Sequence, residues 1–343
     1  MAEVQNYGAT RHSPDMTPLG ELLPLDTPLS IMVDPSNGCN FKCVFCPTGH
    51  PDLLRSVGRK NSVMRPEAFR RLVDGLQGFP TPVKVLHLYK DGEPLLNRWL
   101  GEIVGIARQS DRIDRIETTS NGALMTADRA AELIDAGIDG IRISVYGLDD
   151  DSYRANTRGG ASFDTVVQNV ATLFALKSAK RPTMHVHCKI IDTGLSHADK
   201  KHFIDTFSPI ADTVHIDSLQ GWSDTGDRDM TLGRNPTTGM SGAPIRPARK
   251  ACSEPFMRLA VNSNGDVSVC CVDWAHETTV GNVNEQSLYE IWHGQPLQLF
   301  RLKHLSGLRN TIKACASCHY VLGLRPNTDF DDRLAGLIPK YAA

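Results

Sequence analysis

Three cysteines stand within eight positions in the stretch SNGCNFKCVFC, residues 36–46. Cys39, Cys43 and Cys46 have the spacing C-x₃-C-x₂-C. Three thiolates can hold three irons of a [4Fe–4S] cube and leave the fourth iron open for another ligand, whereas a cluster that only transfers electrons normally has four cysteines. Half of a zinc site is the alternative, but zinc loops favour paired C-x₂-C elements or added histidines, and the nearest one here is His50. The spacing therefore favours a cluster with one open iron.

A second group of cysteines lies near the C-terminus. Its four members are Cys252, Cys270, Cys315 and Cys318, and the last two form a C-x₂-C pair. Four thiolates fit a closed cluster, whose saturated irons suit electron transfer better than substrate binding. Tetrahedral zinc would use the same four ligands, so both interpretations stay open at this point.

Two further cysteines need a different explanation. Cys188 lies in MHVHCKI, a strand pattern with alternating apolar residues, where a thiol usually packs as a small hydrophobic group. Cys271 follows Cys270 inside an expected β run, NGDVSVCC. Successive strand side chains point to opposite faces, so we expect Cys271 to point away from the group that Cys270 holds. It is either a buried structural thiol or a hydrogen-atom donor.

Strand patterns alternate with helical patterns along the first two thirds of the chain. Six strands in that order predict a parallel sheet with right-handed crossovers, in an open, partial barrel of six β/α units. In such a barrel the active groups lie at the C-terminal ends of the strands, and the three-cysteine loop directly follows the first strand. The expected strands are 29–34, 83–89, 115–120, 140–147, 184–191 and 213–219. The expected helices are 66–77, 98–110, 126–137, 162–178 and 197–211.

Three histidines, His185, His187 and His215, lie on the last two expected strands. They face a possible barrel interior, where they are either substrate contacts or core histidines with satisfied hydrogen bonds.

The composition changes after the last of these strands. Residues 222–250 are rich in Gly, Pro, Thr and Asp and show no periodicity, which predicts a linker or a substrate lid. Short β signals around an Asn-Gly turn then begin a small α+β domain. The expected organisation is an N-terminal extension (1–27), a partial barrel (28–221), the linker or lid (222–250), the small domain (251–325) and a tail (326–343).

Overall composition limits the class of protein. The chain has 343 residues with 41% hydrophobic and 22% charged residues, as a globular protein with a large core does. The formal net charge of -2 gives no general attraction to nucleic acid or to a membrane surface. We expect a cytoplasmic chain, because we find neither an apolar run of about 20 residues nor a secretion signal. Nine cysteines in a reducing compartment indicate metal ligands or redox groups.

The three-cysteine loop resembles that of the radical S-adenosylmethionine (SAM) superfamily, which has an aromatic residue before the last cysteine, here Phe45. YKDGEPLLN (89–97) is similar to the family's GGE segment, with Asp91 in place of the first glycine and with Gly92 and Glu93 kept. The resemblance implies that the methionine part of SAM binds the open iron. Reduction of the cluster then yields a 5′-deoxyadenosyl radical that abstracts hydrogen from a substrate.

Other strand-end segments extend this resemblance. TTSNG and ISVYG are similar to segments that contact SAM. YRANTRGG resembles a segment with a tyrosine followed by an Arg-Gly pair, whose arginine would bind the SAM carboxylate through two parallel hydrogen bonds. Arg154 competes with Arg158 for that role, and the serine and asparagine candidates could instead be structural. The SAM contacts that the resemblance implies are Phe45, Gly92, Glu93, Ser120, Asn121, Ser144 and Arg158.

The C-terminal region resembles a shortened SPASM domain, or twitch domain, which implies one auxiliary [4Fe–4S] cluster on Cys252, Cys270, Cys315 and Cys318. The whole design resembles the butirosin-type aminocyclitol dehydrogenases. That resemblance implies oxidation of a secondary alcohol on a sugar or aminocyclitol-like small substrate, with the auxiliary cluster accepting the electron. The partners expected are this substrate and an external electron donor such as flavodoxin or ferredoxin, with no nucleic acid and no membrane.

Three alternatives remain. A sugar epimerase would use a thiol, with Cys271 as the candidate, to return hydrogen to the substrate. A peptide-modifying SPASM maturase is weakened because the sheet begins by about residue 29, which leaves no obvious peptide-recognition domain before it. A non-enzymatic zinc scaffold is the alternative outside the enzymes.

Overall fold

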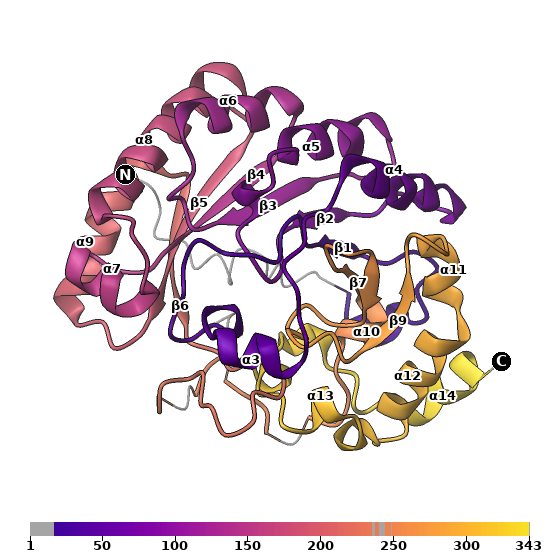
Figure 1. Ribbon diagram of the computed structural model, residues 1–343. Coiled ribbons are helices and arrows are strands. Elements are labelled where there is room, and N and C mark those ends of the chain that lie inside the picture. Colours follow the sequence, from indigo (N-terminus) through magenta and orange to yellow (C-terminus); the bar gives the residue numbers. More distant parts are fainter. Residues whose placement is uncertain (1–16, 235–236, 240–243, 248, 343) are drawn as a thin grey trace.

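A parallel, six-stranded sheet forms the first part of the molecule (Figure 1). A computed structural model describes residues 17–234, 237–239, 244–247 and 249–342. Neighbouring strands follow the sequence, each parallel to the next, which confirms the predicted architecture. The strands are β1 (Ser30–Val33), β2 (Val85–Leu88), β3 (Ile116–Ser120), β4 (Gly140–Val145), β5 (His185–Asp192) and β6 (Thr213–Ser218).

Helices connect these strands and lie along the outer side of the curved sheet (Figure 1). The connecting helices are α4 (Pro66–Asp74), α5 (Leu100–Gln109), α6 (Ala127–Ala136), α8 (Phe163–Lys180) and α9 (His197–Phe207). Two shorter helices, α3 (Pro51–Ser56) and α7 (Asp150–Thr157), belong to loops that follow β1 and β4.

The two faces of the sheet differ in chemistry. On the outer face Ile31, Leu86 and Ile141 are at most 1% exposed and pack in the apolar core, which also contains Cys188 as predicted. Side chains alternate along each strand, so the residues between these point to the inner face. There the register places polar residues of neighbouring strands beside one another, namely His87, Glu117, Arg142, His187 and Lys189.

The C-terminal segment extends the same sheet. Strand β7 (Arg258–Val261) pairs in parallel with β1, and β8 (Asp266–Ser268) and β9 (Thr279–Asn282) follow in antiparallel order. The result is one nine-stranded sheet, so the two parts of the chain share a backbone ladder. Four helices complete this segment: α10 (Glu254–Met257), α11 (Leu288–His293), α12 (Gln295–Leu305) and α13 (Lys313–Ala316).

A second apolar core joins the two ends of the described chain. Helix α2 (Leu19–Leu22) contributes Leu19, and α14 (Leu334–Ala342) contributes Leu337 and Tyr341. Phe256 lies between Phe330 and Tyr341, with ring centroids 5.0 and 5.4 Å away in edge-to-face geometry. Residues 17–27 and 326–342 therefore pack together. Residues 1–16 of the expected extension lie outside the described residues.

The stretch between β6 and α10 contains the expected linker or lid. In its described part there is no helix, and its strand pairing is a single bridge between Thr238 and Pro244. Residues 235–236, 240–243 and 248 of the expected linker lie outside the described part of the chain. Among the described helices, none combines the length and the apolar character that a membrane crossing requires.

We predict that Phe256→Ala will lower the free energy of unfolding by about 3–5 kcal/mol, because it leaves a cavity where three aromatic rings meet. Leu299→Ala on α12 is the matched control, since its side chain is 52% exposed, and it should change stability little. Denaturant unfolding measures both. Equal effects of the two substitutions would contradict the second core.

Candidate active site

The three-cysteine loop follows β1 and is held by the end of α7. The backbone N–H of Lys42 donates to the Thr157 carbonyl at 2.6 Å, and the N–H of Val44 donates to the Asn156 carbonyl at 2.9 Å. The loop therefore has a fixed path across the C-terminal ends of the strands, where the sequence predicted the chemistry.

The three thiols on this loop share one buried environment. Burial raises the pKa of Cys39 to about 12, and it also raises the pKa values of Cys43 and Cys46. The charge of another thiol of the group raises the pKa values of Cys39 and Cys43 further. A buried thiol group of this kind gains most from metal coordination, which replaces the proton and neutralises the thiolate. The donor set thus fits a three-cysteine cluster.

The segment after β2 lies directly on this loop. Its Gly92 has no room for a side chain, because a Cβ there would come within 2.2 Å of the carbonyl oxygens of Ser36 and Gly38. The backbone N–H of Glu93 donates to the Gly38 carbonyl at 2.8 Å. Glycine at position 92 is thus required by the close approach of two backbones.

The Glu93 carboxylate joins this segment to the end of β3. Glu93 is 2% exposed, and its oxygens accept hydrogen bonds from the Ser120 hydroxyl and the Asn121 N–H, both at 2.8 Å. Burial raises the pKa of Glu93, and these donors act in the opposite direction. The Asn121 side chain donates in turn to Asn40 Oδ1 at 2.8 Å, inside the three-cysteine loop. Three of the predicted SAM-contact residues therefore lie together, and sequence reasoning missed Asn40.

Asp91, which departs from the family pattern, has its own buried partners. One carboxylate oxygen lies 2.7 Å from Lys90 Nζ, 2.8 Å from His276 Nε2 and 3.4 Å from Arg59 Nη2. Burial acts to raise the pKa of Asp91, but Lys90 and Arg59 hold it well below its usual range. The side chain therefore forms an ionic link to the C-terminal segment, while the Asp91 carbonyl accepts from the Thr48 hydroxyl at 2.7 Å.

A second carboxylate lies beside this ionic link. Asp34, at the end of β1, is fully buried, and neither of its carboxylate oxygens has a hydrogen-bond partner at normal geometry. Burial, followed by the charge of Asp91, raises the pKa of Asp34. One carboxylate of the pair is thus kept ionised and the other is pushed towards its neutral form.

Two further predicted SAM contacts lie on the loop itself and near the end of β4. The Phe45 ring lies 5.8 Å from the Tyr146 ring, and its carbonyl accepts from Trp222 Nε1 at 3.0 Å. Ser144 lies near the end of β4 and is 5% exposed.

The two candidate arginines differ in position. Arg158 follows α7 directly, in the left-handed region at φ 47°, with an exposed side chain beside the backbone that holds the loop. Arg154 instead pairs with Asp151 on the exposed face of α7. This arrangement favours Arg158 as the partner of a carboxylate bound at the loop.

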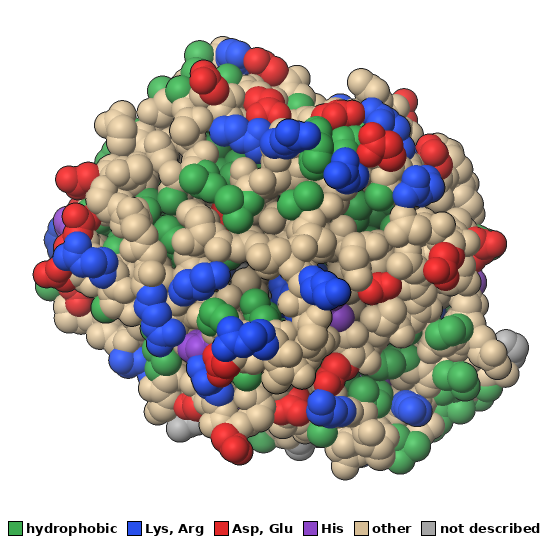
Figure 2. Space-filling view, viewed as in Figure 1, with side chains coloured by type: hydrophobic (Ala, Val, Ile, Leu, Met, Phe, Trp, Pro, Cys, Tyr) green, Lys and Arg blue, Asp and Glu red, His purple; other side chains and the backbone are tan. Residues whose placement is uncertain are grey.

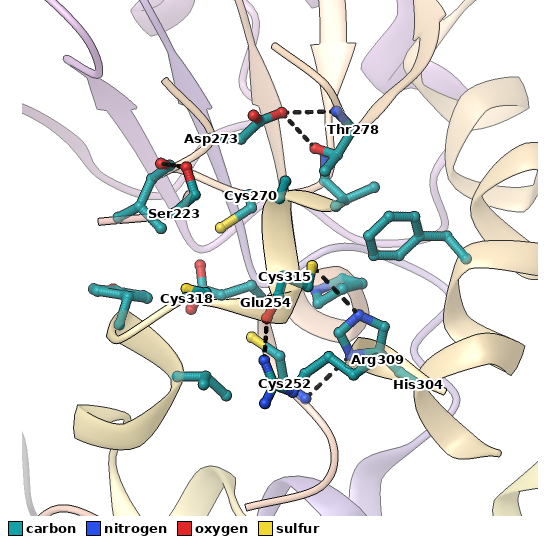
Figure 3. A pocket seen from close by; sticks show the side chains of 17 residues that line it. Ser223, Cys252, Glu254, Cys270, Asp273, Thr278, His304, Arg309, Cys315 and Cys318 are labelled. Carbon is teal, nitrogen blue, oxygen red and sulfur yellow. Dashed lines mark hydrogen bonds between the residues drawn. The ribbon is translucent and has the colours of Figure 1, made fainter. Parts of the chain in front are cut away.

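The four C-terminal cysteines line one cavity. Figure 3 shows that their sulfur atoms point toward a common space, although the residues are spread over more than 60 positions of the chain. Burial raises the pKa of Cys315 to about 12 and also raises the pKa values of Cys252 and Cys318. For Cys270 a hydrogen bond with Cys271 raises the pKa most, followed by burial.

A cluster and a single metal ion require different spacings of the donor groups. Among the described residues, no three His, Cys, Asp or Glu side chains lie close enough together to hold one metal ion. Zinc needs four ligands at about 2.0–2.3 Å, which requires a tighter group of sulfurs than a cube does. Four thiols that line one cavity fit a [4Fe–4S] cube, with one cysteine for each iron.

The expectation that Cys271 lies in a strand is wrong. Strand β8 ends at Ser268, so Cys270 and Cys271 lie in the turn beyond it, where the alternation of strand side chains does not apply. Cys271 does not line the cavity. Its sulfur lies 3.6 Å from Glu254 Oε2 and 4.0 Å from Arg258 Nη1. The thiol therefore faces the buried Arg258–Glu254 ion pair.

Comparison with protein families agrees with this geometry. The radical SAM superfamily model matches residues 33–207, about half of the chain, and the model of an iron–sulfur cluster-binding domain, SPASM, matches residues 252–319. The chain therefore belongs to the radical SAM superfamily and carries a C-terminal SPASM domain. Its cofactors are SAM and [4Fe–4S] clusters, as these two domains imply.

Solved structures share the fold at low sequence identity. BtrN in complex with AdoMet and 2-DOIA is 20% identical with a TM-score of 0.54, over 89% of this chain and 98% of that one. Streptococcus suis SuiB bound to precursor peptide SuiA is 15% identical with a TM-score of 0.62, over 92% and 77%. The anSMEcpe structure with bound AdoMet is 14% identical with a TM-score of 0.59, over 91% and 96%. Identities this low show the fold alone.

A curated relative matches a shorter segment. It is the GTP 3′,8-cyclase of Rhizobium meliloti (strain 1021), which is 31% identical over 152 residues, or 40% of this chain and 41% of the relative. The matched segment thus spans less than half of that protein.

We predict that replacing Cys39, Cys43 and Cys46 together with Ala will abolish formation of 5′-deoxyadenosine from SAM, because no open iron remains. The same variant should keep roughly four irons per chain, the content of one cube. Anaerobic reconstitution followed by iron, sulfide and zinc analysis measures this. Normal SAM cleavage, or zinc in place of the remaining iron, would contradict the assignment of ligands.

Proposed function

We propose that this chain oxidises a secondary alcohol of a sugar or aminocyclitol-like small substrate and passes one electron to an auxiliary [4Fe–4S] cluster. The observation that carries the proposal is the cavity lined by Cys252, Cys270, Cys315 and Cys318. A cluster with four cysteine ligands has no open iron, so it suits electron transfer better than substrate binding.

When bound, SAM and the two clusters supply the radical that removes a carbon-bound hydrogen and the acceptor for one electron. Oxidation of an alcohol then balances if the hydroxyl proton leaves to a base on the protein. The chain must therefore position the alcohol, provide this base and exclude competing hydrogen donors.

The inner face of the sheet offers polar groups for such a substrate. Ser144, Lys189 and His215 lie beside one another on β4, β5 and β6 in the strand register. The side chains of Arg142, Lys189 and His215 are 16%, 21% and 10% exposed although they lie on this inner face. Figure 2 shows a recess near the middle of the viewed face with Lys and Arg side chains at its rim. Such surroundings suit a substrate with several hydroxyl groups.

His215 is the proposed base. Its Nε2 lies 3.1 Å from Asp217 Oδ1, and Lys189 Nζ lies 2.6 Å from Asp217 Oδ2. Burial acts to raise the pKa of Asp217, but Lys189 and His215 hold it well below its usual range, so the carboxylate stays ionised. An ionised carboxylate at Nε2 favours hydrogen on that nitrogen and leaves Nδ1 to accept a proton from the alcohol.

The other two histidines have a different role. Nε2 of His185 and Nδ1 of His187 both lie 2.8 Å from the Thr213 hydroxyl, and burial lowers the pKa of both rings. Both rings thus have a hydrogen-bond partner in Thr213, which supports a structural role for the buried His187, while the side chain of His185 is 30% exposed.

We predict that a panel of aminocyclitols and amino sugars, incubated with SAM and a reductant, will contain a compound converted to a product two mass units lighter. One 5′-deoxyadenosine should form for each product molecule. Cys271→Ala should keep most of this turnover, because the thiol lies outside the cavity lining and is not one of the four proposed cluster ligands. The substitution removes its contact with Glu254 and its hydrogen bond with Cys270, but no group that this mechanism uses. Mass spectrometry and chromatography measure both compounds.

Epimerisation would give a different result in the same experiment. The product would keep its mass in water, would carry one deuterium in D₂O, and would not form in Cys271→Ala although SAM is consumed. The observation that favours this second candidate is the Cys271 thiol itself, which lies outside the cluster cavity. If a peptide is converted and none of the small compounds is, the result would instead favour a maturase.

We further predict that His215→Gln will lower kcat for alcohol oxidation by about 10²-fold or more, because general bases contribute rate factors of about 10² to 10⁴. SAM affinity should stay unchanged, since His215 lies on β6 and its ring contacts Asp217 of the same strand. The control is His202→Gln, at an exposed position on α9. Wild-type kcat in His215→Gln would remove this residue from the mechanism.

A further inference from the structure

One histidine, which is not among the four proposed cluster ligands, lies against the cavity that these four cysteines line. His304, in the last turn of α12, is 0% exposed and lines the cavity (Figure 3). Its ring stacks on Phe300 with centroids 5.1 Å apart and meets the edge of Phe256 at 6.5 Å. The imidazole is therefore held in one orientation by packing.

The hydrogen bonds of this ring identify its tautomer. The backbone N–H of Cys252 donates to His304 Nδ1 at 3.2 Å. A backbone N–H can only donate, so Nδ1 must be the nitrogen without hydrogen. The hydrogen of the neutral ring is therefore on Nε2. Nε2 lies 3.9 Å from Cys315 Sγ (Figure 3).

We propose that His304 donates its Nε2–H to the Cys315 sulfur of the auxiliary cluster and thereby raises the reduction potential of that cluster. The proposal rests on the cysteine ligands assigned in the proposed function. Hydrogen bonds to cluster sulfurs stabilise the more negative, reduced state and so raise the potential. A higher potential makes the cluster a better electron acceptor for an oxidised substrate.

The His304 ring connects two of the proposed cluster ligands. His304 accepts from the backbone of Cys252 and faces the sulfur of Cys315, which lies 63 positions further along the chain. Arg309 Nη1 donates to the Cys315 carbonyl and so holds the backbone of the same residue. His304 is thus a positioning residue that acts on the cluster through its ligands.

Two substitutions separate the role of Nδ1 of the His304 ring from the role of Nε2. In His304→Asn the amide oxygen can replace Nδ1 as the acceptor for Cys252, but the side chain is too short to reach Cys315. In His304→Gln the longer side chain can place its N–H₂ group near the position of Nε2. Both replacements are polar and uncharged, so neither changes the charge at the cavity.

The test is the midpoint potential of the auxiliary cluster, measured by EPR-monitored redox titration. The full-length chain carries Ala at positions 39, 43 and 46, so that a single cluster contributes to the signal. We expect His304→Asn to lower the equilibrium constant for reduction about tenfold, which is about 59 mV for one electron. His304→Gln should restore at least half of that shift. An unchanged potential in His304→Asn at full iron content would overturn the proposal.

A second measurement tests the proposal even if His304→Asn loses its cluster. In the chain with Ala at positions 39, 43 and 46 and with His304 intact, labelled with ¹⁵N-histidine, the reduced auxiliary cluster should show a weak ¹⁵N coupling that disappears in His304→Gln. No ¹⁵N coupling with His304 intact would also overturn the proposal. Both measurements use neither SAM nor substrate, so they do not depend on which reaction the enzyme catalyses. Zinc in the parent variant would instead reject the ligand set.

Discussion

The parallel pairing of β1 with β7 is the constraint on which the rest of the structure depends. It joins residues 30–33 to residues 258–261 and so makes one nine-stranded sheet from the two parts of the chain. The three-cysteine loop leaves the C-terminal end of β1, and Cys252 precedes β7 by six positions. A backbone ladder therefore fixes the relative position of the two cysteine groups more firmly than a flexible linker would.

Side chains strengthen this joint near the candidate active site. Arg59 donates to the Trp274 carbonyl at 2.9 Å and Lys90 to the Asp273 carbonyl at 3.1 Å, while both also lie next to Asp91. Asp91 stands where the family pattern has a glycine, and its side chain connects the segment after β2 with the C-terminal domain. A buried ion pair contributes little net stability, but the loss of one partner leaves an uncompensated charge, so such a group specifies one arrangement of the two parts.

Periodicity and local spacing were sufficient to predict a large part of this molecule. Six strands alternating with helices gave the parallel sheet, and the spacing of Cys39, Cys43 and Cys46 after the first strand located the radical SAM loop. The C-terminal C-x₂-C pair and two single cysteines predicted one four-thiol group, and Figure 3 shows their sulfurs facing one space. These features depend on residues close in sequence or on a resemblance with strict spacing.

Features that depend on long-range contacts could not be predicted in the same way. No local pattern indicates that β7 pairs with β1, because the two strands are more than 220 positions apart. The Asp91–His276 contact joins residues 185 positions apart, and the role of His304 depends on a backbone N–H that lies 52 positions away. The environment of Cys271 was expected from strand alternation, but the strand ends at Ser268 and a turn sets its direction instead.

The most direct test of the account is EPR and Mössbauer spectroscopy of the anaerobically reconstituted wild-type chain with and without SAM. The account predicts two [4Fe–4S] clusters, or roughly eight irons per chain, with SAM changing the spectrum of only one of them because only one has an open iron. The cluster on the four C-terminal cysteines should be unaffected. A single cluster per chain, or two clusters that both respond to SAM, would contradict the account.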